Sequence, residues 1–409
     1  MKIEERFLIS ASLIHLLNHV FLYAFPSVVL FVREDISLSY PEIGVLGTIP
    51  SILMVILSPF AGRTKPGFEV HIIVSGLLIM SFSLLLMSFA QNFMGIAVAV
   101  FILGIGAAAY HPPAFSVVSM LYETRKAEGL SLNQGAGAFG TGLAPFLLTI
   151  SAGLIGWRGT LFFASLTGLL TVPFSIILFI GTPIVIRNLS IKPVVNGKPD
   201  HIVQKDYSFI ALLSGILLFV LFLSTFRATI FRTVCFFSVT LMKDFYGMSK
   251  FESGLITSVL LLLGAIMGFV GGKISDSREN GRIQVLLVSG GGTVIFSLLI
   301  ISFTSAPQLF GIFLYSGFVL IYFIGGSSFA ALLAEAVPKE QRTTAFGLNF
   351  SIGQTAGAFA PAIFGGLLDI SMTAAMAYLF IVSCGSVILV FILNRRSDLR
   401  NNEPLSPLY

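Results

Sequence analysis

Long apolar segments recur along the whole of this 409-residue chain and constrain its fold more than any other feature. A helix needs about 20 residues to cross the roughly 30 Å hydrocarbon layer of a bilayer. We expect twelve such helices, at residues 6–32, 42–61, 70–90, 93–120, 127–152, 158–184, 208–241, 252–274, 283–304, 307–335, 343–369 and 373–394. The sequence therefore predicts an all-α integral membrane protein.

The composition agrees with a lipid environment. Hydrophobic residues make up 56% of the chain and charged residues only 11%, whereas about a quarter of the residues of a soluble domain are charged. The forty glycines suit helix contacts inside a membrane, where small residues let backbones approach closely. The net charge of +5 comes from basic residues placed between apolar segments. Basic residues in such positions set the orientation of a protein in the membrane. We therefore expect the lipid bilayer as a partner and no nucleic acid.

A polar connector at residues 187–206 divides the twelve segments into six and six. Its prolines, asparagine and glycine are typical of a solvated linker. We therefore expect an amino-terminal six-helix bundle at residues 1–186. A second six-helix bundle, with a short cytoplasmic tail, is expected at residues 207–409.

The basic residues predict the orientation. Eighteen of the 24 fall on the side that holds both termini. Four fall on the other side, namely Arg33, Arg158, Lys243 and Lys250. Basic residues are enriched in cytoplasmic loops, so both termini are expected in the cytoplasm, with the protein in the cell (plasma, or inner) membrane.

The two predicted bundles also share a pattern of residues. At an offset of 210 residues, the matches are Glu42, Gly44 and Gly62 with Glu252, Gly254 and Gly272. At an offset of 216 residues, they are Asn133, Gly137 and Pro145 with Asn349, Gly353 and Pro361. A parallel repeat of this kind implies a pseudo-two-fold axis along the membrane normal, with a solute site near mid-membrane where the halves meet.

Two six-helix halves joined by a polar loop resemble the major facilitator superfamily over nearly the whole chain. That family's loop after the second helix of each half carries a glycine, an aspartate and basic residues. The second half has the corresponding residues Gly272, Asp276, Arg278, Gly281 and Arg282, whereas the first-half copy, at residues 58–69, has no aspartate. The resemblance implies that Gly272, Asp276, Arg278 and Arg282 take part in gating.

Two shorter motifs narrow the resemblance. The sequences HLLNH at residues 15–19 and YHPPA at residues 110–114 are similar to the fosmidomycin-resistance-like efflux group, which has an aspartate where His19 stands. This resemblance implies a proton-coupled antiporter. The glycine-rich stretch before Pro145 loosely resembles the family's antiporter motif, and helix packing explains it equally well. The prolines assigned to gating are Pro112, Pro113, Pro145 and Pro361.

Histidine is the predicted proton carrier because all 19 acidic residues fall in loops or near the ends of the apolar segments. An imidazole changes its charge near neutral pH. His15, Asn18 and His19 share one helix face, and His111 lies in the fourth segment, where Pro112 and Pro113 predict a kink. We expect the three histidines to meet inside the membrane. The alternative is that they are neutral groups bonded between helices.

Arg227 and Arg232 lie in the seventh apolar segment. A guanidinium at the bilayer centre costs at least about 2.5 kcal/mol on insertion scales, and an anionic substrate is a natural partner for Arg227. Arg232 either joins the site or turns outward to pair with Glu34 or Asp35. The predicted substrate-binding residues are His15, Asn18, His19, His111, Arg227, Arg232, Gln134, Tyr322, Asn349 and Gln354.

Together these features predict a secondary transporter for a small organic anion or amphiphile, working by alternating access as a proton-coupled exporter. We expect a monomer that is not an enzyme and holds no cofactor. We expect no metal, because carboxylate and thiolate partners are missing near the histidines. The chain has no GxxxxGK[ST] loop for nucleotide-driven pumping. The alternatives are an uptake symporter for an organic anion and a non-transporting membrane sensor on the same fold.

Overall fold

The computed structural model describes residues 1–190, 215–304, 307–337 and 342–401, and within these ranges all regular structure is helical. Ten stretches are long and apolar enough to cross a membrane. One of them, Glu128–Leu178, contains two helices that meet at Gly156, whose φ of 74° interrupts the helix. The two helices of Glu128–Leu178 count as two crossings, and the interrupted segment at 342–370 adds one more. With the other stretches, they give the twelve expected crossings.

The first half of the chain forms eight of the α-helices. These are α1 (Ile3–Leu22), α2 (Ala24–Ile36), α3 (Tyr40–Ala61), α4 (Glu69–Ser88), α5 (Phe93–Ala108), α6 (His111–Leu121), α7 (Lys126–Leu178) and α8 (Thr182–Ser190). A short 3₁₀ turn, η1 (Glu123–Arg125), precedes α7. The expected linker at 187–206 lies outside the described residues, except for 187–190, which belong to α8.

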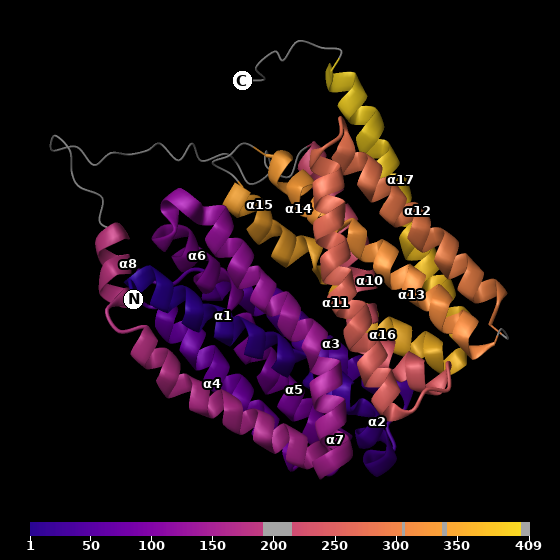
Figure 1. The fold of residues 1–409 in the computed structure, drawn as a ribbon, viewed down its shortest axis with the longest axis horizontal. Coiled ribbons are helices and arrows are strands. Elements are labelled where there is room, and N and C mark those ends of the chain that lie inside the picture. The colour runs from indigo at the N-terminus through magenta and orange to yellow at the C-terminus, as the bar shows by residue number, and fades with distance from the viewer. Residues whose placement is uncertain (191–214, 305–306, 338–341, 402–409) are drawn as a thin grey trace.

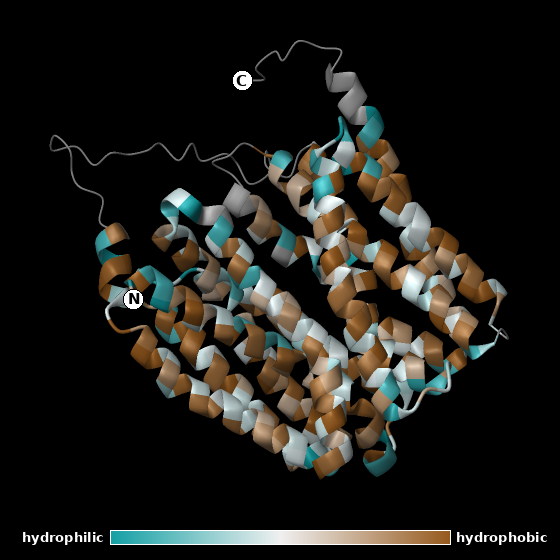
Figure 2. Ribbon diagram, viewed as in Figure 1, coloured by the Kyte–Doolittle hydropathy of each residue, from teal (hydrophilic) through white to brown (hydrophobic). Residues whose placement is uncertain are grey.

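The second half contributes the remaining helices. These are α10 (Ile216–Asp244), α11 (Lys250–Asp276), α12 (Gly281–Ser302), α13 (Gln308–Ile324), α14 (Gly326–Glu335), α15 (Arg342–Leu348), the π-helical turn η3 (Asn349–Gly353), α16 (Thr355–Ile370) and α17 (Met372–Asn401). Figure 1 shows the two halves side by side, with α3 and α7 of the first half facing α16 and α11 of the second. Figure 2 shows apolar residues along the flanks of the helices and hydrophilic ones mainly at their ends.

The predicted kink in the fourth apolar segment is a full break between α5 and α6. The break falls at Ala109 and Tyr110, just before the prolines rather than at them. Pro112 lies in the first turn of α6, where a backbone N–H has no helical partner, so the missing proton costs little. His111 is therefore the first residue of a new helix.

The sequence repeat appears as two equivalent contacts between the halves. A Cβ on Gly44 of α3 would overlap the Pro361 carbonyl and lie 2.9 Å from the Ala362 Cα of α16. A Cβ on Gly254 of α11 would lie 2.8 Å from the Pro145 carbonyl oxygen of α7. Each matched glycine thus packs against the matched proline of the other half, at a spacing that only glycine permits.

A hydrogen bond accompanies each of these two contacts. The Ala362 N–H donates to Thr48 Oγ1 at 3.0 Å, and the Phe146 N–H donates to Ser258 Oγ at 2.9 Å. The hydroxyl residues are 210 positions apart and the donors 216, the two offsets of the sequence repeat. Both donors follow a proline, which disturbs the helical bonding around it.

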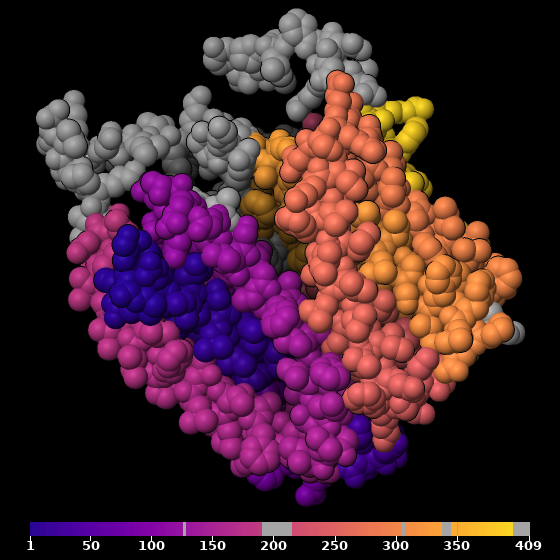
Figure 3. Space-filling model, in the orientation of Figure 1, coloured from indigo at the N-terminus to yellow at the C-terminus, as the bar shows by residue number. Residues whose placement is uncertain are grey.

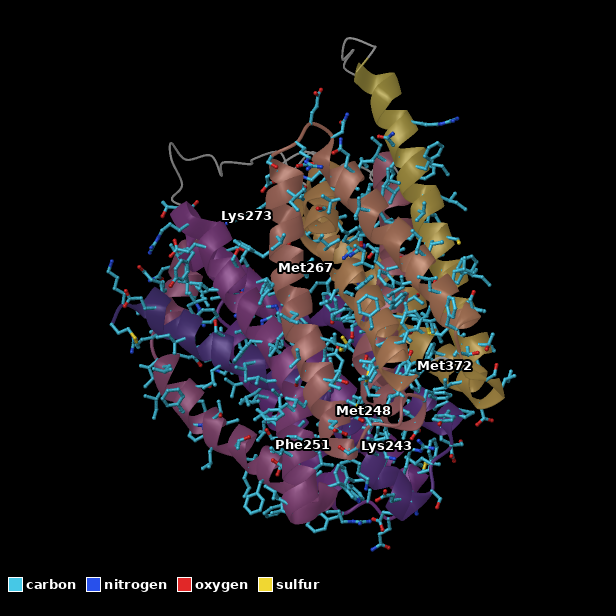
Figure 4. The ribbon with its side chains drawn as sticks, turned by 45° about the vertical axis from the view of Figure 1, so that its right-hand side comes forward. Lys243, Met248, Phe251, Met267, Lys273 and Met372 are labelled. Carbon is cyan, nitrogen blue, oxygen red and sulfur yellow. The ribbon has the colours of Figure 1, made fainter. Side chains whose placement is uncertain are left out.

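The halves are joined at one end of the molecule and diverge toward the other. At the joined end, Arg33 forms an ion pair with Asp244, and Lys250 forms one with Glu34. Figure 4 shows Lys243 and Phe251 toward this end and Lys273 toward the opposite one. In Figures 1 and 3, α7 and α11 separate toward the end that holds Lys273. We call these the closed end and the open end.

Candidate functional site

Three histidines come together inside the first half, as expected from the sequence. The ring centroids of His15 and His19 on α1 are 4.9 Å apart. The His111 ring at the start of α6 lies 5.0 Å from that of His15 and 5.7 Å from that of His19. His15 is fully buried. The break before α6 brings the third imidazole to the other two.

His15 is held by a chain of hydrogen bonds. Its Nδ1 lies 2.8 Å from the backbone carbonyl oxygen of Asn133 on α7. Asn133 Nδ2 donates to the Tyr110 hydroxyl at 2.8 Å, and this hydroxyl donates to the Ala11 carbonyl at 2.7 Å. The His15 ring also stacks on Tyr110, with centroids 4.6 Å apart. Three helical segments thus fix the orientation of one imidazole.

His19 is held by α7 as well. Its Nδ1 lies 2.6 Å from Thr141 Oγ1, and that hydroxyl donates to the Gly137 carbonyl at 3.1 Å. A Cβ on Gly137 would lie 2.6 Å from His15 Nε2. The repeat residue Gly137 therefore makes room for the histidines.

The other predicted residues of the first half lie elsewhere. Asn18 is buried, and its Nδ2 donates to Met80 Sδ of α4 at 3.2 Å. Gln134 is exposed, whereas its neighbour Asn133 is buried in the histidine network. Asn133 was visible in the sequence as a repeat position, but nothing there indicated that its backbone carbonyl would hold His15.

Arg227 is buried within the second half. Its Nη2 donates to the Tyr322 carbonyl at 3.3 Å, and its Cζ lies 4.8 Å from the centre of the Tyr322 ring. The Tyr322 hydroxyl donates in return to the Arg227 carbonyl at 2.7 Å. Ser289 of α12 donates to the same Tyr322 carbonyl. These contacts tie α10 to α12 and α13 of the same half.

Arg232 instead reaches the first half. Its Nη1 donates to Ser51 Oγ of α3 at 2.7 Å. The alternative pairing of Arg232 with Glu34 or Asp35 is wrong.

Glu34 and Asp35 both pair with other residues. Glu34 pairs with Lys250, and Asp35 accepts from Arg158 and from Trp157 Nε1. Since Arg158, Lys250 and Arg33 are all paired in this way, three of the four basic residues expected on the side away from the termini form ion pairs there.

Asn349 and Gln354 lie at a π-helical turn between α15 and α16. Asn349 is the first residue of η3 and is buried, and Gln354 directly follows that turn. The turn packs against α10 and α3. π-Helical turns often occur at functional sites.

The loop residues assigned to gating form a charge network at the open end. Arg282 at the start of α12 donates to Ser275 Oγ at 2.6 Å, to Asp276 and to Glu335 Oε1 at 3.2 Å. It thereby joins the ends of α11 and α14. Arg278 is exposed, and Gly272 packs against Ser327.

Carboxylates are confined to helix ends throughout the described ranges. Each described Asp or Glu side chain lies within three residues of a helix terminus or in a connection. None of these acidic groups accompanies the histidines or Arg232 in the middle of the membrane-spanning helices.

A family model described as the Major Facilitator Superfamily matches residues 11–361, and matches again at residues 221–407. The chain belongs to this superfamily. An uncharacterized MFS-type transporter of Bacillus subtilis, YfnC, is 25% identical over 96% of this chain and 94% of its own length. A probable nitrate transporter of Staphylococcus epidermidis, NarT, is 24% identical over 88% of each chain.

Solved structures have the same fold. A D-xylose-proton symporter matches with a TM-score of 0.76 at 15% identity, over 96% of this chain and 97% of that one. A bacterial homolog of the human lysosomal transporter Spinster, inward-facing and unoccupied, matches with a TM-score of 0.71 at 16% identity, over 100% and 99%. These matches confirm the predicted all-α membrane fold. This multi-pass membrane protein is a secondary transporter of a small molecule and not an enzyme.

Proposed function

We propose that this transporter carries a small organic anion together with a proton, and that Arg232 binds the anion between the halves. The supporting observation is the incomplete pairing of Arg232. It donates across the interface to neutral Ser51, while its Nε is buried without a hydrogen-bond partner among the described residues. A charge in the middle of a membrane-spanning helix normally needs an opposite charge, and no described carboxylate supplies one to the half-buried Arg232. An anionic solute would complete the site.

Arg227 has a different role in this proposal. It bonds to Tyr322 and holds the second half together. Tyr322, Asn349 and Gln354 then support the site from that half. Asn18, which bonds to Met80, and the exposed Gln134 take no part in it.

The three histidines supply the proton site in the proposed mechanism. Protonation of the cluster adds positive charge inside the membrane, so in this proposal it strengthens the binding of an anion. Binding of the proton therefore strengthens binding of the anion, and binding of the anion strengthens binding of the proton, as a symporter requires. The resemblance to the fosmidomycin-resistance-like group instead favours efflux by antiport, in which the two would compete, and this is the second candidate function.

The positions of the basic residues support a proposed orientation of the protein in the membrane. We place the open end and both termini in the cytoplasm of the cell (plasma) membrane, with the Arg33–Asp244 and Lys250–Glu34 pairs sealing the outer side. The gating set would act at the two ends. Arg282 joins three helices at the open end, whereas Pro145 and Pro361 pack between the halves toward the closed end. The working unit is the monomer.

Anion uptake into proteoliposomes tests the proposal. The wild-type protein would be screened against small organic anions and nitrate, with a pH gradient imposed in either direction. Symport moves the anion with the protons, and antiport moves it against them. R232Q should lower transport about 10- to 100-fold, because a hydrogen bond to a charged group contributes about 1.5–3 kcal/mol. R158Q, which removes the charge of an exposed pair, is the matched control. Unchanged transport by R232Q would refute the anion-binding role.

A further inference from the structure

The hydrogen bonds of His15 and His19 fix which ring nitrogen carries the proton. The Asn133 carbonyl can only accept, so His15 Nδ1 must donate to it. With the Thr141 hydroxyl donating to the Gly137 carbonyl, the matching arrangement has His19 Nδ1 donate to Thr141 Oγ1. In both neutral rings the lone pair is then on Nε2.

These two lone pairs are buried. Among the described residues, neither His15 Nε2 nor His19 Nε2 has a hydrogen-bond partner. One ligand atom from each of His15, His19 and His111 can be chosen so that all three lie within 4.8 Å of one another. The cluster thus presents at least two buried acceptors, and a third imidazole, to whatever occupies the space between them.

We propose that His15, His19 and His111 form a binding site for a divalent first-row transition-metal ion such as Zn²⁺. Neutral imidazoles suit Zn²⁺, Co²⁺, Ni²⁺ and Cu²⁺, whereas Mg²⁺ and Ca²⁺ require oxygen ligands. Three protein ligands leave one position of a tetrahedral zinc site open for water or an anionic group. From the sequence we expected no metal, because carboxylate and thiolate ligands are missing near the histidines. Three histidines alone can hold zinc, with the fourth position open.

The outer bonds of the histidines match those of known metal ligands. A metal-binding histidine usually donates its other ring N–H to a carbonyl, a carboxylate or water, which fixes the tautomer and the orientation of the ring. His15 donates to a backbone carbonyl, and His19 donates to a hydroxyl whose own proton is engaged. The site is therefore oriented before any ion arrives.

This inference does not rest on the proposed function, because ion binding is measured on the purified protein without transport. Co²⁺ would be titrated into metal-free protein in detergent and followed by its visible absorption, with Zn²⁺ as competitor. We expect one tightly bound ion per chain. H15Q, H19Q and H111Q should each weaken the binding strongly. H71Q, at an exposed histidine on α4, is the matched control and should leave it unchanged.

A second variant distinguishes loss of a metal ligand from misfolding. T141V keeps all three histidines and removes only the acceptor of the His19 Nδ1 proton, so it should weaken Co²⁺ binding about 10- to 100-fold. Absence of Co²⁺ binding by the wild type, binding unaffected by the histidine substitutions, or an equal loss in H71Q would overturn the proposal.

Discussion

The two halves share a tyrosine hydrogen bond and differ in the charged or titratable side chain that packs against the tyrosine ring. In each, a tyrosine near the break in the fourth helix donates to a backbone carbonyl of the first helix, as Tyr110 does to Ala11 and Tyr322 does to Arg227. In the first half the tyrosine ring stacks on a histidine, His15, and in the second it lies beneath an arginine. The repeat thus keeps the hydrogen bond while the charged chemistry differs.

The difference indicates a division of labour between the halves. The histidine of the first half joins two other imidazoles that can take up a proton or an ion. The arginine of the second half is enclosed by its own helices, and a second arginine, Arg232, reaches across to Ser51. In our proposal the first half contributes the proton site and the second the anion site.

The largest effect is expected where the halves touch at matched glycines. In G44A the new Cβ would overlap the backbone of α16, and relief of such overpacking typically costs about 1–3 kcal/mol. The closed end should then seal poorly, so transport should fall about tenfold or more. Labelling of Cys235, which lies beside Tyr23 of the first half, by an impermeant maleimide in a C384S background should accelerate.

G254A is the equivalent substitution in the second contact and should act in the same way, because its Cβ would lie 2.6 Å from Thr149 Cβ. G135A is the matched control, since its Cβ would meet nothing within 4 Å. If G44A and G254A behaved like G135A, the two contacts would not be part of the transport cycle.

An intermediate effect should distinguish the two tyrosines. Y110F leaves Asn133 Nδ2 and the Ala11 carbonyl without their partner, at a cost of about 1–3 kcal/mol for a buried unpaired group. Y322F removes one bond and leaves the ring beneath Arg227. The melting temperature in detergent should therefore fall more in Y110F than in Y322F. An equal or reversed order would show that the network around His15 is not tighter than its counterpart.

The smallest effect is expected from the ion pairs at the closed end. D244N weakens the contacts to Arg33 and Tyr40, and pairs of this kind contribute about 0–1 kcal/mol. Transport should change by less than about fivefold, and the change should shrink at high salt, where such pairs are screened. Measurement of transport by D244N at low and high ionic strength checks this. Abolished transport would show that the pair does more than seal the outer side.

The sequence predicts the fold well because long apolar segments recur along the whole chain. The lengths of the apolar segments predicted the membrane crossings. The i, i+4 spacing of His15 and His19, together with the kink expected at Pro112 and Pro113, predicted the histidine cluster. The sequence favoured Arg227 as the partner of an anion, whereas Arg232 is the arginine that reaches the first half. Five residues rotate a side chain by about 140° around a helix, so the two point to different faces. A helix that is apolar all round gives no sign of which face meets the other half.

Transport by H19Q and R232Q, compared side by side in proteoliposomes and metal-free buffer, tests the division of labour most directly. We expect H19Q to keep solute exchange between equal concentrations but to lose accumulation driven by a proton gradient. We expect R232Q to lose both, because its anion site is gone. The division of labour between the halves would be contradicted if R232Q exchanged solute at the wild-type rate, or if H19Q still accumulated it with the gradient.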